Sequence, residues 1–337
     1  MVRHIFHLRE AFVLESGVLL PELTITYHTS SPVFNGKKVL WICHALTANS
    51  DPTEWWEVMV GSGKCFDPDE YFIVCANIIG SCYGSTGPMS INPATGTPWY
   101  DSFPMVSVRD LVAAHHTLRK ALGIENVDMV IGASIGGFQA LEFALFPPQI
   151  CNHLVLIACN ARISPWGTAF NESQRMSILA DDTYWECRPG GGEKGLAAAR
   201  SIGLLSYRSY DGYRLSQGES DPDTFLAKRA ATYQQYQGEK LKKRFDAYSY
   251  MTLTKTFDTH NVGRGRGGTE EALKSIRAKT LCIGITGDQL FPPHEVEYMA
   301  KHIPEAYYTS IHSNFGHDGF LLEWEALSEI ITHFRVQ

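Results

Sequence analysis

The stretch Val130-Ile131-Gly132-Ala133-Ser134-Ile135-Gly136-Gly137 decides the fold of this chain. It fits the pattern G-x-S-x-G, with Ser134 at its centre. An apolar, strand-like run at residues 127–131 leads into the pattern, and a helix-like run at residues 138–145 leads out of it. A strand, a sharp turn and a helix in this order predict a nucleophile elbow, which presents a serine hydroxyl at the end of a sheet beside a helix N-terminus.

The glycines of the pattern support this interpretation. Gly132 and Gly136 fit an elbow because a side chain at either position would collide with the tight turn. A glycine-rich turn that merely packs tightly would match the same five residues. The flanking strand and helix patterns favour the elbow, and with it an acyl-transfer or hydrolytic enzyme.

The composition is that of a globular protein with a sizeable core. Of the 337 residues, 44% are hydrophobic and 19% are charged, which suits one large domain or one domain with an insertion. The formal net charge of −7 argues against nucleic acid as a general partner. No apolar run is long enough to span a bilayer, and the first residues lack the apolar core of a signal peptide. We therefore expect neither a nucleic-acid nor a membrane partner.

The cysteines indicate a reducing compartment. The chain has eight of them, and none forms a C-x-x-C pair. Several lie in apolar, strand-like runs, where a reduced cysteine behaves as a small hydrophobic residue. This usage favours a cytoplasmic enzyme over a disulfide framework.

Short apolar runs alternate with helical patterns along most of the chain. The runs expected to form buried strands are residues 38–43, 71–76, 127–131, 153–158, 280–285 and 307–311. Strands separated by helices form parallel units, so the predicted fold class is α/β, with a mostly parallel central sheet covered on both faces. Two earlier segments, residues 11–14 and 23–28, predict a hairpin or meander around Gly17.

Residues 162–275 break this alternation. They are rich in Arg, Tyr, Gln and Gly and show helical patterns without buried strands. We interpret them as a helical lid inserted into a core made of residues 1–161 and 276–337. Residues 263–268 lack the preceding strand and the lysine of a phosphate-binding loop, so we interpret them as a flexible basic loop.

Two residues after the lid complete a catalytic triad with Ser134. A serine hydroxyl is a weak nucleophile and needs a base, which in turn needs an orienting group. In this fold the chain order is Ser, then Asp or Glu, then His. Asp288 follows the strand-like run 280–285, and His317 lies in a glycine-flanked loop after the last strand. Each alone could be an ordinary turn or loop residue, but their order and positions predict that His317 acts as the base and Asp288 orients it.

The oxyanion hole needs two backbone N–H donors. One should come from the residue after the nucleophile, Ile135, and the other from the loop after the first core strand. That loop is His44-Ala45-Leu46-Thr47, and we assign the second donor to Leu46. No spacing of histidines and carboxylates matches a metal motif, so we expect no metal.

Several blocks of the sequence resemble the homoserine O-acetyltransferase family of the α/β-hydrolase superfamily. They include the lid, which a generic esterase would not share. The blocks lie at residues 44–47, 80–88, 90–93, 103–104, 132–142, 195–200, 206–208, 244–250, 288–292 and 316–321. The resemblance implies an α/β-hydrolase fold and transfer of an acetyl group from acetyl-CoA to the hydroxyl of L-homoserine, in methionine synthesis. It also implies a ping-pong mechanism, with acetyl-CoA as a co-substrate and no cofactor.

The same resemblance implies a substrate site and an assembly. Arg200 would bind the homoserine carboxylate with its two-pronged guanidinium group. Asp318 would bind the ammonium group, and Tyr207 is a further candidate contact. The implied partners are therefore small-molecule substrates and a second copy of the chain, in a homodimer formed through the lid.

The chain departs from the commoner pattern of this family beside the nucleophile. Ile135 and Phe138 stand where methionines are frequent, and Ala133 stands where glycine is frequent. These changes line the pocket differently and leave alternatives open. The donor could be succinyl-CoA, the acceptor could be L-serine, or the same triad could serve an esterase.

Overall fold

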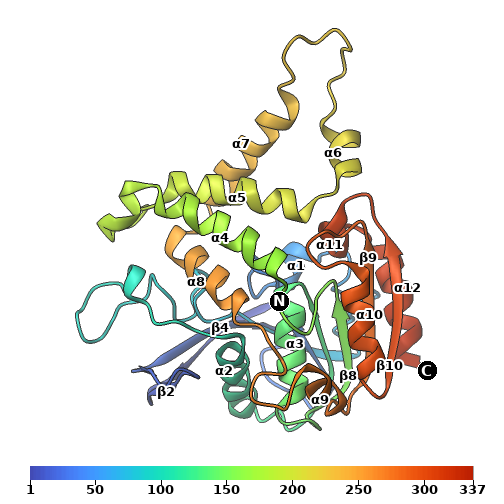
Figure 1. Ribbon diagram of the computed structural model, residues 1–337. Helices are drawn as coiled ribbons and strands as arrows, with labels where there is room; N and C mark the ends of the chain where they lie inside the picture. Colours follow the sequence, from blue (N-terminus) through green and yellow to red (C-terminus); the bar gives the residue numbers. More distant parts are fainter. Residues whose placement is uncertain (337) are drawn as a thin grey trace.

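An eight-stranded sheet runs through the centre of the computed structural model, which describes residues 1–336 (Figure 1). The pairs β1–β4 and β4–β6 are antiparallel, and all other neighbours are parallel. The predicted α/β class with a mostly parallel sheet is confirmed. In order across the sheet, the strands are β1 (Val2–Leu8), β4 (Leu23–Thr29), β6 (Tyr71–Ala76), β5 (Lys38–Cys43), β7 (Val127–Ala133), β8 (Cys151–Ile157), β9 (Lys279–Thr286) and β10 (Ala306–His312).

The first strands differ from the sequence-based expectation. β2 (Phe12–Val13) pairs with β3 (Leu19–Leu20) in a short hairpin around Gly17, so a hairpin forms there, but its second strand is Leu19–Leu20 and not residues 23–28. The hairpin closes earlier because Gly17, at φ 84°, takes a left-handed turn that glycine adopts easily. β4 pairs instead with β1, which no buried apolar run announces, because its side chains are all exposed or half-buried.

Alternating side chains on the central strands build a core on each face of the sheet. On β5, Val39 and Trp41 belong to one buried cluster, whereas Leu40 and Ile42 belong to the other. Residues of α2 (Val108–Ala121), α3 (Ile135–Leu145) and α10 (Pro293–His302) join the first cluster. Residues of α12 (Trp324–Val336) join the second. The central strands are therefore buried on both sides, which fixes the positions of their carboxyl ends.

Between β8 and β9 the described chain forms helices and one isolated backbone bridge. In Figure 1, α4 to α8 lie above the sheet, while α9 lies low in the core and contacts α10. The segments at residues 161–163 and 260–262, which connect these helices to the core, lie side by side. Ile163 N donates to His260 O (3.1 Å) and Val262 N donates to Ala161 O (3.0 Å). The helices are α4 (Pro165–Leu179), α5 (Glu193–Tyr207), α6 (Tyr210–Gln217), α7 (Arg229–Lys242), α8 (Ala247–Asp258) and α9 (Thr269–Lys274).

Short elements complete the description. They are α1 (Pro52–Trp55), α11 (Gly319–Leu322) and three 3₁₀ turns, at Tyr100–Ser102, Asp182–Glu186 and Gly316–Asp318. All eight cysteines carry free thiols. Within residues 1–336, none of the helices combines the length and the apolar character needed to cross a membrane.

Candidate active site

Ser134 occupies a strained turn between β7 and α3. Its backbone has φ 58° and ψ −129°, a conformation that non-glycine residues rarely adopt. The Ser134 N–H donates to Ile157 O on the neighbouring strand (3.1 Å), which anchors the turn to the sheet. The helix starts at the next residue, so the serine lies at the carboxyl edge of the sheet and at a helix N-terminus. This is the geometry predicted for a nucleophile elbow.

The two glycines of the pattern have no room for a side chain. A Cβ atom on Gly132 would lie 2.0 Å from Gly136 O, across the turn. A Cβ atom on Gly136 would lie 2.2 Å from Cys43 O, at the end of β5. Both obstacles are backbone atoms that cannot rotate away, so the predicted requirement for glycine at these positions is confirmed. Their absence of side chains lets α3 approach both β7 and β5.

His317 and Asp288 form a buried pair that leaves one ring nitrogen free for the serine. The distance from His317 Nδ1 to Asp288 Oδ2 is 2.8 Å, and both residues are almost fully buried. The second oxygen, Asp288 Oδ1, accepts hydrogen bonds from the N–H groups of Leu290 (2.8 Å) and Phe291 (2.9 Å). The carboxylate therefore has both oxygens occupied and cannot turn. With Nδ1 bound, Nε2 is the nitrogen of His317 that remains to accept a proton.

The surroundings of His317 favour its protonated form. Burial lowers the pKa of His317, but the charge of Asp288, its hydrogen bond and the charge of Asp318 raise it more, so that the pKa lies above its usual value of 6.5. A base with a raised pKa holds the proton of the serine more readily during attack. The pair can therefore carry out the proton transfers expected of a triad.

One pocket collects most of the residues predicted for the site. It has a volume of about 410 Å³, and Ser134 and His317 line it together with Leu46. The three residues carried over from the family resemblance, Arg200, Tyr207 and Asp318, also line it. Ile135 follows Ser134 as the first residue of α3, where the helix itself offers its N–H no acceptor. Asp288 lies behind His317, outside the pocket lining. The roles of these residues stay predictions, but their proximity is now a structural fact.

The loop that carries Leu46 is held from the core side by a residue that sequence reasoning missed. Gln139 on α3 donates from Nε2 to His44 O (3.1 Å) and to Ile135 O (3.2 Å). His44 in turn accepts from Ile78 N at its Nε2 (3.1 Å). One buried amide thus ties His44, two residues before the predicted donor Leu46, to Ile135, the other predicted donor. A lone glutamine on an apolar helix face was the only signal in the sequence.

Asp318 is not a free carboxylate. Its Oδ2 lies 2.9 Å from Nε of Arg208, an ion pair that the sequence did not announce. Burial raises the pKa of Asp318, and Arg208, His317 and Arg200 offset part of this rise. Oδ2 of Asp318 is therefore already paired, so the predicted contact with a substrate ammonium group would fall to Oδ1. Arg208 adjoins Tyr207 in a block that resembled the family, and that adjacency was its only sequence signal.

Arg200 and Tyr207 form a pair on the lid side of the pocket. The Arg200 guanidinium carbon lies 5.6 Å from the centre of the Tyr207 ring, within range of a cation–π contact. The Tyr207 ring is 5.9 Å from the His317 ring. α5 therefore brings a cation and an aromatic ring close to the base from above, while the core supplies the nucleophile from below.

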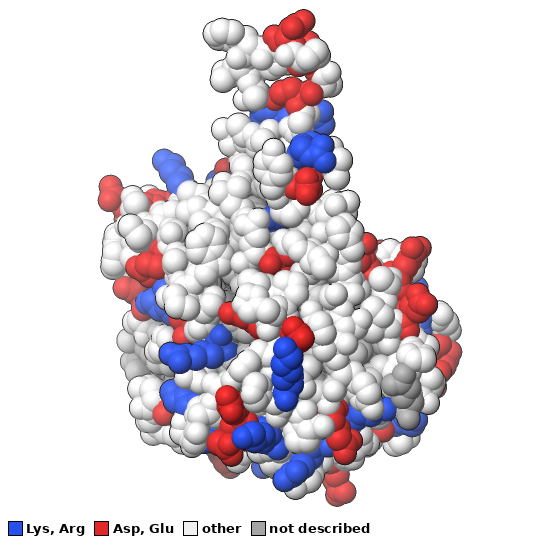
Figure 2. Space-filling model, turned by 45° about the vertical axis from the view of Figure 1, so that its right-hand side comes forward, with Lys and Arg blue, Asp and Glu red and all other residues white. Residues whose placement is uncertain are grey.

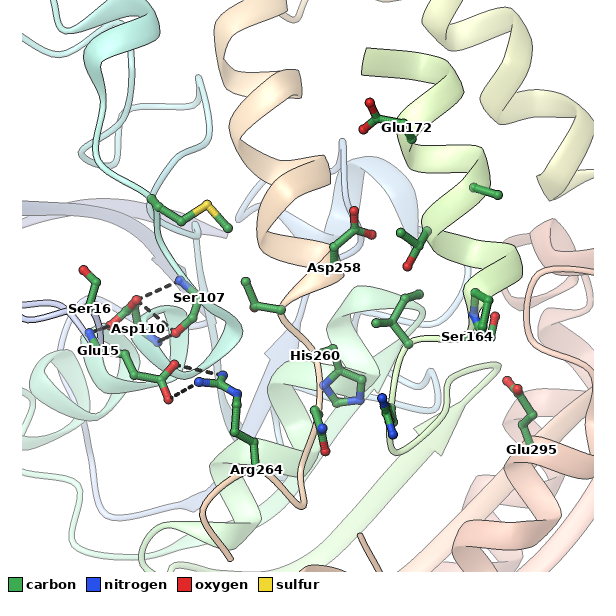
Figure 3. Close-up of a pocket in the computed structure, with 18 residues that line it drawn as sticks. Glu15, Ser16, Ser107, Asp110, Ser164, Glu172, Asp258, His260, Arg264 and Glu295 are labelled. Atoms are coloured by element: carbon green, nitrogen blue, oxygen red, sulfur yellow. Dashed lines mark hydrogen bonds and ion pairs between the residues drawn. The ribbon is translucent and has the colours of Figure 1, made fainter. Parts of the chain in front are cut away.

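A wider pocket of about 1150 Å³ lies elsewhere, where the lid meets the core (Figure 3). Three of its charged residues, Glu15, Asp110 and Arg264, bind one another or the neighbouring Ser107. Arg264 contacts both oxygens of Glu15 (2.8 and 3.0 Å), and the Asp110 carboxylate accepts from Ser107 Oγ (2.9 Å) and from Glu15 N (2.6 Å). Neither Ser134 nor His317 lines this pocket. The chemistry therefore belongs to the smaller pocket.

Comparison with known proteins agrees with this geometry. A family model described as alpha/beta hydrolase fold matches residues 38–323. The homoserine O-acetyltransferase of Cyclobacterium marinum is 44% identical to this chain, over 100% of this chain and 96% of that protein. This chain belongs to the homoserine O-acetyltransferase family. The predicted resemblance is confirmed, and the family is one of acyltransferase enzymes with the α/β-hydrolase fold.

Similar solved structures identify the fold of this chain but not its reaction. A homoserine O-acetyltransferase from Bacillus anthracis superposes with a TM-score of 0.92 at 22% identity, covering 100% of this chain and 98% of that one. The acetyl esterase MekB superposes with a TM-score of 0.87, also at 22% identity, covering 100% and 97%. At such identities the likeness shows the fold alone. Because transferases and esterases share it, the reaction must be argued from the family and the site.

Proposed function

We propose that this protein transfers an acetyl group from acetyl-CoA to the hydroxyl of L-homoserine, giving O-acetyl-L-homoserine and CoA, a step that serves methionine synthesis. The observation that carries the proposal is the pocket in which a serine and a buried His–Asp pair face an arginine and a carboxylate. Homoserine carries a carboxylate and an ammonium group, which these two charges complement. Relatives that match this chain over its full length, at up to 44% identity, are named homoserine O-acetyltransferases.

The chemistry proceeds in two halves through Ser134. In the first, Ser134 Oγ attacks the thioester carbonyl carbon while His317 takes the hydroxyl proton. The N–H groups of Leu46 and Ile135 stabilise the oxyanion, and CoA leaves as its thiol after His317 returns the proton. In the second, the homoserine hydroxyl attacks the acetyl-enzyme, His317 takes its proton, and Ser134 leaves and regains one. Acetyl-CoA thus acts as a co-substrate rather than a resident cofactor.

The lining of the pocket supports acetyl over succinyl as the acyl group. A succinyl donor adds a carboxylate that needs a cation of its own. The arginines that line the pocket are Arg200 and Arg244. Arg200 is assigned to the homoserine carboxylate, and Arg244 donates to Thr47 O and to the Tyr83 hydroxyl. Neither is left for a second carboxylate.

A substrate matrix tests the proposal. Acetyl-CoA and succinyl-CoA are each combined with L-homoserine, L-serine or no acceptor, and the products are identified by mass. We expect acetyl-CoA with homoserine to give the fastest thiol release, and Ser134→Ala to give none above background. Thiol release at the same rate without an acceptor would mean hydrolysis, and would leave the transferase proposal untenable. Faster product formation with succinyl-CoA or serine would reassign the donor or the acceptor.

We also propose a homodimer formed through α6 and α7. These helices and the segment between them project from the body as an arm that bears both acidic and basic side chains (Figures 1 and 2). Large hydrophobic side chains are exposed along it, which is unusual for a monomer. They are Tyr210, Leu215, Phe225, Leu226 and Tyr236.

Light scattering after gel filtration tests this assembly. We expect a dimer for the wild type and a monomer for the double variant Leu215→Asp/Tyr236→Asp. Val33→Asp, at an exposed apolar residue outside the arm, serves as the matched control and should stay dimeric. A wild type that elutes as a monomer at about 50 µM, the micromolar affinity range of weak assemblies, would contradict the dimer. A cytoplasmic location, which the eight free thiols support, is checked by cell fractionation.

A further inference from the structure

The turn between α7 and α8 joins the lid to two loops of the core. Phe245 in this turn is buried, and its ring packs edge-on against Tyr83, with centroids 5.7 Å apart and planes at 72°. Cys82 Sγ lies 3.6 Å from the backbone oxygen of Arg244. The turn is therefore seated on the loop at residues 82–83 by packing and by its backbone.

The side chain of Arg244 reaches further, to the loop that carries Leu46. Nη1 donates to Thr47 O and to the Tyr83 hydroxyl (2.7 Å), and Nη2 donates to Thr47 Oγ1 (3.3 Å). Two nitrogens of one guanidinium group thus hold both the backbone and the side chain of Thr47. A planar guanidinium group in such a fork fixes orientation as well as distance.

Leu46 consequently lies between two anchors of different origin. On one side, Gln139 of the core helix α3 holds His44 O. On the other side, Arg244 of the lid holds Thr47 O. Between these two carbonyl groups, Ala45 O accepts from Ala48 N (3.0 Å) within the same loop, and Leu46 is buried. The predicted oxyanion donor, the N–H group of Leu46, lies in this segment. The position of that N–H therefore depends on the lid being seated.

We propose that Arg244 is a positioning residue that completes the oxyanion hole from the lid, so that Ser134 is acylated efficiently only when the lid is in place. The inference rests on the proposed acyl-transfer function. It gives the enzyme a way to link reactivity to exclusion of water, because the same seated lid that shields the acetyl-enzyme also aligns the Leu46 N–H.

A different role for the same arginine would be to bind the phosphate groups of CoA. Arg244 lines the pocket and is exposed, as a phosphate ligand at the mouth would be. Its hydrogen bonds to Thr47 and Tyr83 favour the positioning role instead. The two roles differ in one measurable respect: a phosphate ligand matters only for a donor that carries phosphate.

The experiment measures the acylation rate of Ser134 in single turnovers with two donors, acetyl-CoA and p-nitrophenyl acetate, of which the second has no phosphate. Removing an oxyanion donor outright costs 10²–10³ in rate, so misplacing one should cost about 10- to 100-fold. We expect Arg244→Ala to slow acylation by this factor with both donors. The KM for acetyl-CoA should rise by a much smaller factor. Arg244→Lys, which keeps one donor for Thr47 O, should lie between it and the wild type.

Controls separate the inference from its alternatives. Lys243→Ala removes the neighbouring exposed lysine and should acylate at the wild-type rate. Tyr83→Phe removes one acceptor of Arg244 and should slow acylation by two- to fivefold, the effect of losing one hydrogen bond of about 0.5–1 kcal/mol. A midpoint of thermal unfolding within a few degrees of the wild type shows that a variant folds. If Arg244→Ala does not fold, the acylation rate of Arg244→Lys tests the inference in its place.

Two results would overturn the inference. One is an unchanged p-nitrophenyl acetate rate in Arg244→Ala or Arg244→Lys, whatever happens with acetyl-CoA. The other is a defect confined to the KM for acetyl-CoA, which would make Arg244 a donor ligand. A wild type that forms no acyl-enzyme at all would instead refute the proposed function, so the two failures are distinguishable.

Discussion

Asp288→Asn should reverse the hydrogen-bonding role of His317 without disturbing the fold. Asp288 Oδ1 accepts from two backbone N–H groups, of Leu290 and Phe291, whereas Oδ2 faces His317 Nδ1. In an asparagine, the two N–H groups require the amide oxygen at the Oδ1 position. The NH₂ group must then face His317, and it can only donate. His317 is forced to accept at Nδ1 and to carry its proton on Nε2, where it can no longer take the proton of Ser134.

The expected loss follows from this forced tautomer. A catalytic histidine held in the wrong tautomer loses about 10⁴ in kcat, or about 5.5 kcal/mol of transition-state stabilisation. Asp288 is also the main group that raises the pKa of His317 against the lowering effect of burial. Wild-type acylation should therefore rise with pH around a midpoint above 6.5, and in Asp288→Asn that midpoint should fall.

Single-turnover acylation by acetyl-CoA between pH 5 and 9 measures both effects. Asp318→Asn is the matched control, because it removes a neighbouring carboxylate that does not hold His317 Nδ1. It should raise the KM for homoserine, slow acylation much less, and lower the midpoint by less. An Asp288→Asn enzyme that is folded and within tenfold of the wild-type acylation rate would refute the reasoning, since the pinned amide leaves no other tautomer.

Three further predictions concern the substrate, acid stability and the elbow. Arg200→Ala should raise the KM for homoserine about 10- to 100-fold while the acetyl-enzyme still forms, because a charge-assisted hydrogen bond contributes about that much to binding. Arg188→Ala, at an exposed lid arginine, is the control. A normal KM for homoserine in Arg200→Ala would remove Arg200 from the site. Gly136→Ala should cost at least about 3 kcal/mol in urea unfolding, because its Cβ would lie 2.2 Å from Cys43 O; a stability equal to the wild type would contradict the close approach. Four buried histidines should also make the fold sensitive to acid. Burial lowers the pKa of each, so below about pH 6.5 the unfolded chain binds protons that the folded chain does not. Each histidine then lowers the free energy of unfolding by up to about 1.4 kcal/mol per pH unit. Stability should therefore fall between pH 6.5 and 4, and equal urea midpoints at pH 7 and 5 would contradict this. Their pKa values are about 4 for His44, 3 for His115, 4 for His116 and 3 for His260.

The sequence predicted those parts of the site that local geometry determines. Ser134 could be assigned because the glycines on either side of it permit only one kind of turn. Asp288 and His317 could be assigned because each follows a strand, and parallel strands bring their carboxyl ends to one edge of the sheet. β1 was missed because a half-exposed edge strand lacks the apolar run that marks a buried one.

What the sequence did not reveal depends on contacts between distant residues. Arg244 and Thr47 are 197 positions apart, and Gln139 and His44 are 95 apart. Arg208 pairs with Asp318 across a similar gap in the chain. No periodicity or motif encodes which polar side chain will meet which distant loop. Such partners follow only from how the helices and loops pack on the sheet.

The division of labour between core and lid explains how one fold can serve two reactions. Ser134, His317 and Asp288, which are predicted to act as nucleophile, base and orienting carboxylate, follow strands of the sheet. The same architecture superposes on an acetyl esterase with a TM-score of 0.87. Arg200 and Tyr207 stand on α5 instead, above the pocket. Water needs no recognition, whereas an amino-acid acceptor must be bound and water kept away. If the core makes the acyl-enzyme and the lid selects who receives the acyl group, then changes on α5 should alter the balance between transfer and hydrolysis and leave acylation intact. Arg244 is the exception, because its hydrogen bonds reach Thr47, next to the predicted oxyanion donor Leu46.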